Sequence, residues 1–408
     1  MKKYVPYLIA TLFVFSISCE SASKPSLIKS EKNVRTIKAD DIKKSYKEYA
    51  INYLKVSESR VNEELAKIKY DITFCKVTYE AVDPSGNTKI LSGLIGYPNL
   101  PDNEKEKPLT IVSVQHGTLF SESEAPSFNT FKDAGTLRDA LTLIPPAHEN
   151  GYIIVVPDYF GYGSDEKDIH YYEVRPSLAE AARKLIEAIP SFTKDKSLHT
   201  DTSRLFLFGY SEGGFATMST LKSFSENRSN FTDIITVAGA GAYDKVATAT
   251  HVIQQTTGDS PNFTASYLWV LLTYNTVYGI NKDLNQLVQP DLIPVIEKYA
   301  GTDKIMQSKQ IPSAPSKAFS PEFVKGIVER TDNAFMKALE DNDVSDFNAL
   351  GKVELVHGTK DTWVPTFNTD SAFIRLQKRE VDVDKYLYDG GTHSTTYPVF
   401  VLKALSKL

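Results

Sequence analysis

A short apolar run that ends in a serine between glycines constrains the fold of this 408-residue chain more than any other feature. Residues 204–214 have the sequence RLFLFGYSEGG, and a helix-compatible segment over 215–224 follows at once. The pattern predicts a buried strand, a sharp turn at Ser211 and a helix, the arrangement called a nucleophile elbow. Gly209 and Gly213 leave room at that turn, where a Cβ atom would clash. The N–H groups of the following helix point at Ser211, which suits a developing negative charge.

Short apolar runs alternate with helical segments along much of the chain. Runs without polar alternation suit strands that are buried on both faces of a parallel sheet. We expect such strands at 109–114, 152–156, 204–208, 234–238, 353–356 and 385–388, and a helix at 177–189. This order predicts a mostly parallel, doubly wound α/β sheet. Two extended runs, 72–82 and 89–97, are joined by turn-forming residues and predict an N-terminal antiparallel hairpin.

The longest gap between predicted strands indicates an insertion. More than a hundred residues separate the strands expected at 234–238 and 353–356, far beyond an ordinary crossover. We interpret about 243–350 as an inserted helical cap over the carboxyl ends of the strands, within one domain that spans 41–408. The apolar run 267–280 either forms the core of this cap or closes over the serine and lines a substrate pocket.

The first residues of the chain predict export. Residues 1–18 combine Lys2 and Lys3 with an apolar stretch too short to span a membrane, as a signal peptide does. Cys19 follows small residues, which resembles the processing site of bacterial lipoproteins, so we expect lipidation there; cleavage that leaves a free Cys19 is the alternative. Residues 19–40 would tether the domain to the membrane. The protein would then lie in the cell envelope, anchored to the outer membrane or facing the periplasm.

Composition narrows the classes of partner. The chain is 41 % hydrophobic and 24 % charged, and its net charge of −5 comes without a basic stripe, so nucleic acid is not an expected partner. The histidines and cysteines lack metal-binding spacing, and we expect neither a metal nor a cofactor. After processing, Cys75 would have no cysteine partner inside the domain and is expected to be a buried thiol. Nothing in the sequence indicates the oligomeric state.

Two residues later in the chain are candidates for the base and the acid that would activate the serine. Serine is a weak nucleophile at neutral pH and requires a histidine base that an acid holds in place. On a sheet of this kind the three follow one another as serine, acid and histidine. Asp361 comes just after the strand expected at 353–356, and His393 comes just after the last strand. With Ser211, all three lie at the carboxyl ends of parallel strands, where such sheets place their sites.

Two other side chains compete for these roles. His357 ends a predicted strand ahead of Asp361 and is expected to be structural. Asp389 is four residues from His393 on the same strand end, an awkward place from which to orient that ring. Asp361 is therefore the expected acid.

Together these motifs resemble those of α/β-hydrolases of the secretory lipase type, a group that includes lipase-A-like enzymes and bacterial esterases. The resemblance covers roughly residues 70–400 and rests on 115–118 (QHGT), 157–163 (PDYFGYG), 209–214 (GYSEGG), 357–365 and His393. It implies the α/β-hydrolase fold with an insertion over the site. It also implies hydrolysis of small-molecule carboxylic esters through an acyl-enzyme, without a cofactor.

An oxyanion at the serine needs two N–H donors. The backbone of Glu212 supplies one because it directly follows Ser211. The loop at 115–118 resembles the donor loop of lipases and esterases, which implies the N–H of Thr118 as the second donor and Gly117 as the residue that permits the turn. The Glu212 side chain is expected to face solvent or a neighbouring cation.

Two other functions stay open. A serine peptidase on the same fold would use the same triad, although no repeat domain and no acidic cluster for a substrate amine is visible in the sequence. A non-catalytic envelope lipoprotein could use the scaffold to bind a ligand. Such a binder would have no use for a strained serine, so ester hydrolysis is the expected activity.

Overall fold

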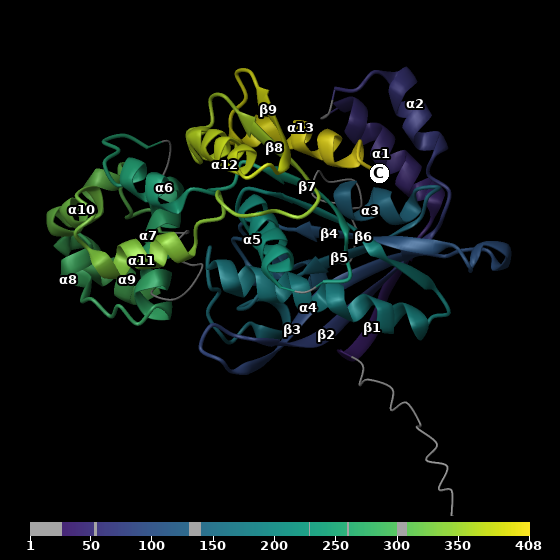
Figure 1. Ribbon diagram of the computed structural model, residues 1–408, viewed down its shortest axis with the longest axis horizontal. Coiled ribbons are helices and arrows are strands. Elements are labelled where there is room, and N and C mark those ends of the chain that lie inside the picture. Colours follow the sequence, from purple (N-terminus) through teal and green to yellow (C-terminus); the bar gives the residue numbers. More distant parts are fainter. Residues whose placement is uncertain (1–26, 53–54, 130–139, 228, 259–260, 300–307) are drawn as a thin grey trace, which may run out of the picture.

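A mostly parallel sheet forms the centre of the computed structural model, which describes residues 27–52, 55–129, 140–227, 229–258, 261–299 and 308–408 (Figure 1). In that part of the chain the strands lie in the order β1-β2-β3-β5-β4-β6-β7-β8-β9. They span Ile28–Ile37 (β1), Ile72–Val82 (β2), Thr88–Pro98 (β3), Pro108–Gln115 (β4), Tyr152–Pro157 (β5), His199–Tyr210 (β6), Asp233–Gly239 (β7), Lys352–Gly358 (β8) and Asp382–Tyr388 (β9). The pairs β1–β2, β2–β3 and β3–β5 are antiparallel, and the pairs from β5 to β9 are parallel. The predicted doubly wound sheet with its N-terminal hairpin is confirmed.

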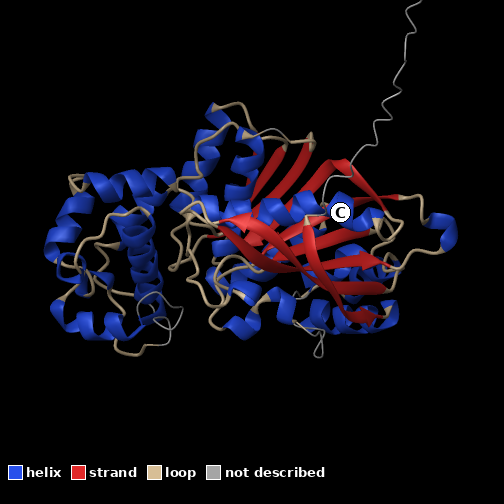
Figure 2. Cartoon of the chain, turned by 90° about the horizontal axis from the view of Figure 1, so that it is seen from below, coloured by secondary structure: helices blue, strands red, loops and turns tan. Residues whose placement is uncertain are grey.

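Two cores lie on the two faces of the sheet, because successive side chains of a strand point to opposite sides. On β4, Ile111 belongs to one core and its neighbour Val112 to the other, and both are fully buried. Helices lie on both faces (Figure 2). The first core contains residues of α4 (Arg175–Lys194), α5 (Glu212–Glu226) and α12 (Phe367–Lys378). The second contains residues of α1 (Ala39–Asn52), α2 (Glu58–Ala66), α3 (Ala140–Ala147) and α13 (His393–Leu405).

The N-terminal strand β1 corrects the predicted tether. Residues 28–37 pair along β2, from Ile28 opposite Tyr79 to Ile37 opposite Ile72, so the prediction of a tether over 19–40 is wrong from Ile28 onward. Most β1 side chains are exposed because the strand lies at the edge of the sheet. Its polar sequence therefore lacks hydrophobic alternation, and backbone pairing holds it in place. The predicted signal peptide, Cys19 and the first part of the tether lie outside the described residues.

A group of helices, which we call the cap, occupies the segment predicted as an insertion, about 243–350. Its described helices are α6 (Lys245–Val252), α7 (Pro261–Val277), α8 (Leu284–Leu287), α9 (Ile293–Tyr299), α10 (Pro321–Val328) and α11 (Asn333–Asp341). They gather beside the sheet around a core of their own that includes Trp269, Phe323 and Phe335 (Figure 1). The Tyr267 hydroxyl donates to the carbonyl oxygen of Trp363, just after β8, at 2.9 Å. The cap therefore contacts the carboxyl end of the sheet.

The helices that the structure describes are all too short or too polar to cross a membrane.

Candidate active site

Ser211 occupies the predicted sharp turn between β6 and α5. Its backbone has φ 62° and ψ −126°, a conformation that residues with a Cβ atom rarely adopt. Its N–H donates to the carbonyl oxygen of Gly239 at 2.9 Å, which holds the strained turn. A Cβ atom at Gly209 would lie 2.2 Å from the carbonyl oxygen of Gly213, and one at Gly213 would lie 2.1 Å from that of Gln115. The glycines are therefore required by the close approach of backbone to backbone.

Gly213→Ala should lower the free energy of unfolding by at least about 2 kcal/mol, because the new methyl group overlaps a backbone oxygen that cannot move freely. Urea denaturation followed by circular dichroism measures the change. Gly326→Ala, in α10, is the matched control, since its new Cβ meets the Asp332 side chain at 3.1 Å. That variant should change the free energy by less than about 1 kcal/mol. Equal stability of the two variants would contradict a tightly packed elbow.

The three residues predicted at the strand ends meet in space. Nδ1 of His393 lies 2.7 Å from Oδ2 of Asp361, and Nε2 of His393 lies 2.9 Å from Oγ of Ser211. A carboxylate can only accept, so Nδ1–H donates to Asp361 and Nε2 is left to accept the Ser211 hydroxyl proton. The His393 side chain is 19 % exposed, whereas that of Asp361 is fully buried. The imidazole can thus be reached from outside while the carboxylate is kept from water.

Asp361 is ionised by its hydrogen bonds although it is buried. Its Oδ1 accepts from the backbone N–H groups of Trp363 and Val364, each at 2.9 Å. Burial favours the neutral carboxyl group, but hydrogen bonds from His357 and His393 outweigh burial and hold the pKa of Asp361 well below its usual range. The carboxylate is therefore charged at neutral pH, as a group that stabilises an imidazolium must be.

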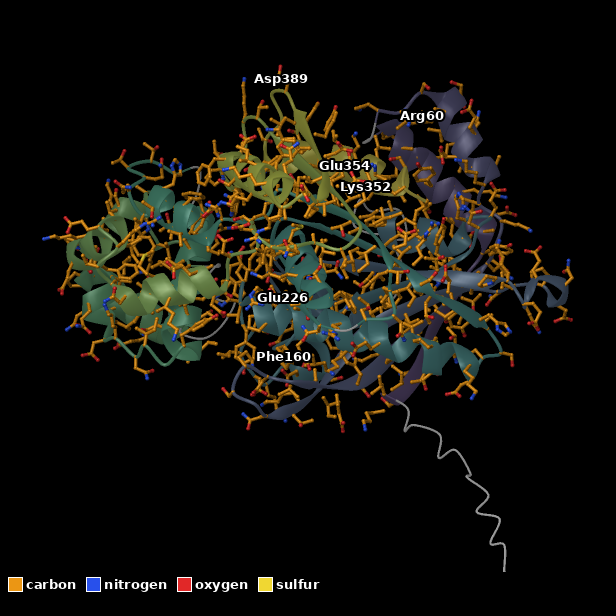
Figure 3. All side chains as sticks on the ribbon, in the orientation of Figure 1. Arg60, Phe160, Glu226, Lys352, Glu354 and Asp389 are labelled. Atoms are coloured by element: carbon orange, nitrogen blue, oxygen red, sulfur yellow. The ribbon has the colours of Figure 1, made fainter. Side chains whose placement is uncertain are left out.

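The surroundings of the two rivals differ from those of the triad residues. His357 is buried, with Nδ1 2.8 Å from the Thr369 hydroxyl and Nε2 2.9 Å from the carbonyl oxygen of Val364, contacts that suit a structural histidine. Its Nε2 also lies 3.3 Å from Oδ2 of Asp361. Asp389 is exposed at the outer tip of the turn after β9 (Figure 3) and accepts from the Thr359 hydroxyl at 3.3 Å. The fold brings Asp361 to the His393 ring.

The predicted donor loop lies against the elbow. A Cβ atom at Gly117 would lie 3.1 Å from the carbonyl oxygen of Tyr210 and 3.7 Å from Cβ of Ser211. Thr118 follows, and its hydroxyl forms a hydrogen bond with the Tyr172 hydroxyl at 2.9 Å. Glu212 is the first residue of α5 and directly follows Ser211. Gly117 of the predicted donor loop and the first residue of α5 thus approach Ser211 from two separate segments.

Comparison with known proteins identifies the family. A model of the family described as "Secretory lipase" matches residues 132–376, more than half of the chain. The chain belongs to the secretory lipase family. This secretory lipase family member is therefore a hydrolase of the lipase and esterase type, and the family's description agrees with the export predicted from the leader sequence. No match was found among curated proteins.

Solved structures share the fold of this secretory lipase family member. A Legionella pneumophila protein described as a hydrolase is 21 % identical, with a TM-score of 0.75 over 93 % of this chain and 96 % of that one. The rice cell wall degrading esterase LipA from Xanthomonas oryzae is 18 % identical, with a TM-score of 0.74 over 93 % and 95 %. Candida antarctica lipase A is 11 % identical, with a TM-score of 0.61 over 90 % and 77 %. These similarities, with the sheet described above, show the α/β-hydrolase fold.

The Glu212 side chain does not face solvent, which was one of the two surroundings predicted for it. It is buried, and its Oε1 lies 2.7 Å from Nε2 of the buried His170. Its neighbour comes from residues 168–174, the part of the loop between β5 and α4 that matches no recognisable motif. That loop folds over the start of α5, a long-range contact that no local pattern indicates. His170 is a residue of the site that sequence reasoning missed.

The same loop joins the site to the cap. Tyr172, which contacts Thr118, stacks on Trp269 of α7 with ring centres 4.2 Å apart. Nζ of Lys245 lies 2.5 Å from the Glu173 carboxylate, and the Tyr274 hydroxyl donates to the Glu173 carbonyl oxygen at 2.9 Å. Burial raises the pKa of Glu173 and lowers that of Lys245. The ion pair acts in the opposite direction on both pKa values, because each charge stabilises the other. Trp269 and Tyr274 of run 267–280 thus belong to the core of the cap and also contact the loop beside the site.

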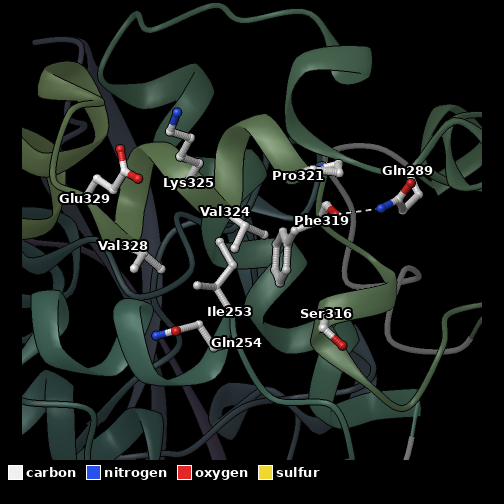
Figure 4. Close-up of a pocket in the computed structure, with 10 residues that line it drawn as sticks. All are labelled: Ile253, Gln254, Gln289, Ser316, Phe319, Pro321, Val324, Lys325, Val328 and Glu329. Carbon is white, nitrogen blue, oxygen red and sulfur yellow. Dashed lines mark hydrogen bonds between the residues drawn. The ribbon is translucent and has the colours of Figure 1, made fainter.

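The described residues also line an open cavity of about 450 Å³ between α6 and α10 (Figure 4). Apolar side chains line much of it, including Ile253, Phe319 and Val324. None of the lining residues belongs to the predicted site, so hydrogen-bond geometry, and not cavity size, locates the candidate active site. Among the described residues no cluster of histidine, cysteine or acidic side chains is arranged to hold a metal ion.

Proposed function

We propose that this protein hydrolyses carboxylic esters through an acyl-enzyme, with Ser211 as nucleophile, His393 as general base and acid, and Asp361 as the carboxylate that holds the imidazole. The observation that carries the proposal is the continuous chain of short hydrogen bonds from Asp361 through His393 to Ser211, at 2.7 and 2.9 Å. Family membership supports the choice of an ester as substrate.

In this mechanism Oγ of Ser211 attacks the ester carbonyl carbon while its proton passes to Nε2 of His393. The Asp361 carboxylate stabilises the imidazolium that forms. The N–H groups of Glu212 and Thr118 donate to the oxyanion of the tetrahedral intermediate, aided by the positive end of α5. His393 then returns the proton to the leaving alkoxide, and water, activated by the same nitrogen, releases the acid from Ser211.

Covalent labelling tests the proposal. A fluorophosphonate should react with one serine per molecule, and peptide mass spectrometry should locate the adduct on Ser211. Heat-denatured protein is the control, because only the folded site activates the serine. Absence of labelling would favour a non-catalytic binder, and labelling of another residue would overturn the assignment of Ser211 as the nucleophile. Cleavage of nitroanilides as fast as nitrophenyl esters would indicate a peptidase instead.

We also propose that a lipid on Cys19 holds the exported protein in the envelope. The proposal rests on the sequence of the leader, since residues 1–26 lie outside the described part of the chain. Strand β1 begins at Ile28, so about nine residues would join the lipid to the sheet and could reach at most about 30 Å. The domain would therefore work close to a membrane surface.

Cys19→Ala should release the protein from the membrane fraction or leave it unprocessed, because two or more acyl chains are needed for stable anchoring. Fractionation and intact mass measure the outcome. Cys75→Ala is the matched control and should stay with the membranes, since Cys75 is buried in the sheet. Wild-type protein that carries no lipid by mass spectrometry would exclude the anchor without affecting the proposed activity.

A further inference from the structure

Directly after the nucleophile, a buried carboxyl group has a histidine as its partner. Oε1 of Glu212 lies 2.7 Å from Nε2 of His170, and the two side chains are 1 % and 3 % exposed. The other oxygen, Oε2, is buried and has no hydrogen-bond partner among the residues that the structure describes. Within that part of the chain, His170 alone provides a hydrogen bond for this carboxyl group.

The second nitrogen of His170 determines how many protons the pair holds. Nδ1 lies 2.8 Å from the carbonyl oxygen of Phe160, which can only accept, so Nδ1 carries a hydrogen. Nε2 and the Glu212 carboxyl group then share a single proton. The pair is either an imidazolium with a carboxylate or an imidazole with a carboxylic acid. Its net charge is zero in both forms.

Aromatic side chains keep water away from the pair. Four rings have their centres 4.7 to 6.1 Å from that of the His170 imidazole: Tyr162, Trp269, Tyr172 and Tyr159. Among the charged groups that interact electrostatically with Glu212, Lys245 and Glu173 form a pair of their own. A net charge on Glu212 would therefore act on its surroundings with little screening, because the effective dielectric constant of such a site is low.

The charge of Glu212 matters because of where its own backbone lies. The N–H of Glu212 is a proposed donor to the oxyanion, and the residue is covalently joined to Ser211. An uncompensated carboxylate on that residue would repel the negative charge that develops in the transition state. It would also offset the favourable field at the start of α5. A partner that cancels this charge would remove both effects.

We propose that His170 is a positioning residue of the active site: it neutralises the Glu212 carboxyl group and fixes it beside the nucleophile, so that the Glu212 amide can stabilise the oxyanion. The inference rests on the proposed function of Ser211. His170 acts through Glu212 and exchanges no proton with Ser211.

Two substitutions and their combination test this role. His170→Asn can keep the hydrogen bond to Phe160, because its amide nitrogen takes the place of Nδ1, but it cannot reach Glu212. Glu212→Gln keeps a hydrogen bond to a neutral imidazole while removing the negative charge. The double variant has neither the histidine nor the charge that it compensates.

His170→Asn should lower kcat by about 10- to 100-fold with a change in KM of less than about threefold. Glu212→Gln should lower kcat by up to about fivefold. The double variant should recover most of the activity lost in His170→Asn, because no carboxylate is left to oppose the oxyanion. Inhibition by a trifluoromethyl ketone, whose adduct with serine carries the same oxyanion, should weaken in His170→Asn and recover in the double variant.

An exposed pair of the same type provides the control. His199 and Glu106 lie 3.1 Å apart at the opposite end of the sheet, and His199→Asn, Glu106→Gln and their combination should leave kcat unchanged. Melting temperatures report whether each variant is folded. If His170→Asn does not fold, His170→Gln, which offers Glu212 only a neutral donor, replaces it in the same comparison.

The outcomes separate this inference from the proposed function. Folded double variants as slow as the single His170 variant would show a merely structural histidine and overturn the inference. Fluorophosphonate labelling of wild-type protein checks Ser211 independently. Wild type without labelling would overturn both proposals, whereas labelled wild type without recovery in the double variant would overturn this one alone.

Discussion

Ser211→Ala should reduce kcat/KM for nitrophenyl esters by at least about 10⁴-fold while the protein stays folded. The hydroxyl oxygen is the atom that would form the acyl-enzyme, and the Nε2 nitrogen of His393 lies 2.9 Å from it. A methyl group offers no nucleophile, and the proposed N–H donors could give only a small residual rate. Initial rates with nitrophenyl butyrate, together with circular dichroism, measure the effect.

Ser219→Ala is the matched control for this loss. Ser219 lies two turns further along α5, is buried, and donates to the carbonyl oxygen of Phe215 at 2.7 Å. Its removal should leave kcat/KM within about twofold of wild type, because a helix carbonyl keeps its backbone partner. Retained activity of Ser211→Ala in a preparation free of other esterases would contradict the assignment of the nucleophile.

Asp361→Asn should lower kcat by about 10³- to 10⁴-fold, the second largest effect that we expect. An amide in place of the Asp361 carboxylate can donate to Nδ1 of His393. The ring hydrogen would then move to Nε2 and point at Ser211, where a proton acceptor is needed. Loss of the carboxylate also removes the charge that stabilises the imidazolium. Steady-state kinetics with the same ester measures the change.

Asp389→Asn separates the two candidate acids. Asp389 is exposed and its hydrogen bond is to Thr359, so its substitution should change kcat by less than about twofold. A greater loss in Asp389→Asn than in Asp361→Asn would show that the acid is wrongly assigned. Melting curves of both variants are needed, because Asp361 also accepts hydrogen bonds from two backbone N–H groups, and these bonds stabilise the turn after β8.

The central strands could be predicted because burial on both faces makes each of them an unbroken apolar run. Strand β5, Tyr152–Pro157, is buried at every position, and the sequence marks it clearly. Strand β1 could not be predicted, because its exposed side chains impose no period and its pairing with β2 depends on backbone groups that every residue has. Composition alone therefore indicated a tether where the fold has an edge strand.

The candidate triad could be predicted because its parts obey local rules. The elbow requires glycine where backbones approach within contact distance, and the carboxyl ends of parallel strands lie at one edge of the sheet. Asp361 and His393 follow strands β8 and β9, so their positions in the chain were enough to predict them as residues of the site. The prediction of Thr118 as a donor depended on the resemblance to lipases and esterases, because a residue of any type can donate through its backbone N–H.

By itself the sequence determined the sheet's central strands, the elbow and the segment that the cap occupies, since each follows from contacts between near neighbours or from the periodic burial of side chains. Only the tertiary structure decided which groups share the buried space around the serine. His170 and Glu212 are 42 residues apart, and Glu173 and Lys245 are 72 apart. A buried charge is costly in free energy unless a partner stabilises it. That partner comes from whichever loop the fold places beside it, and such a long-range contact leaves no spacing or period in the sequence.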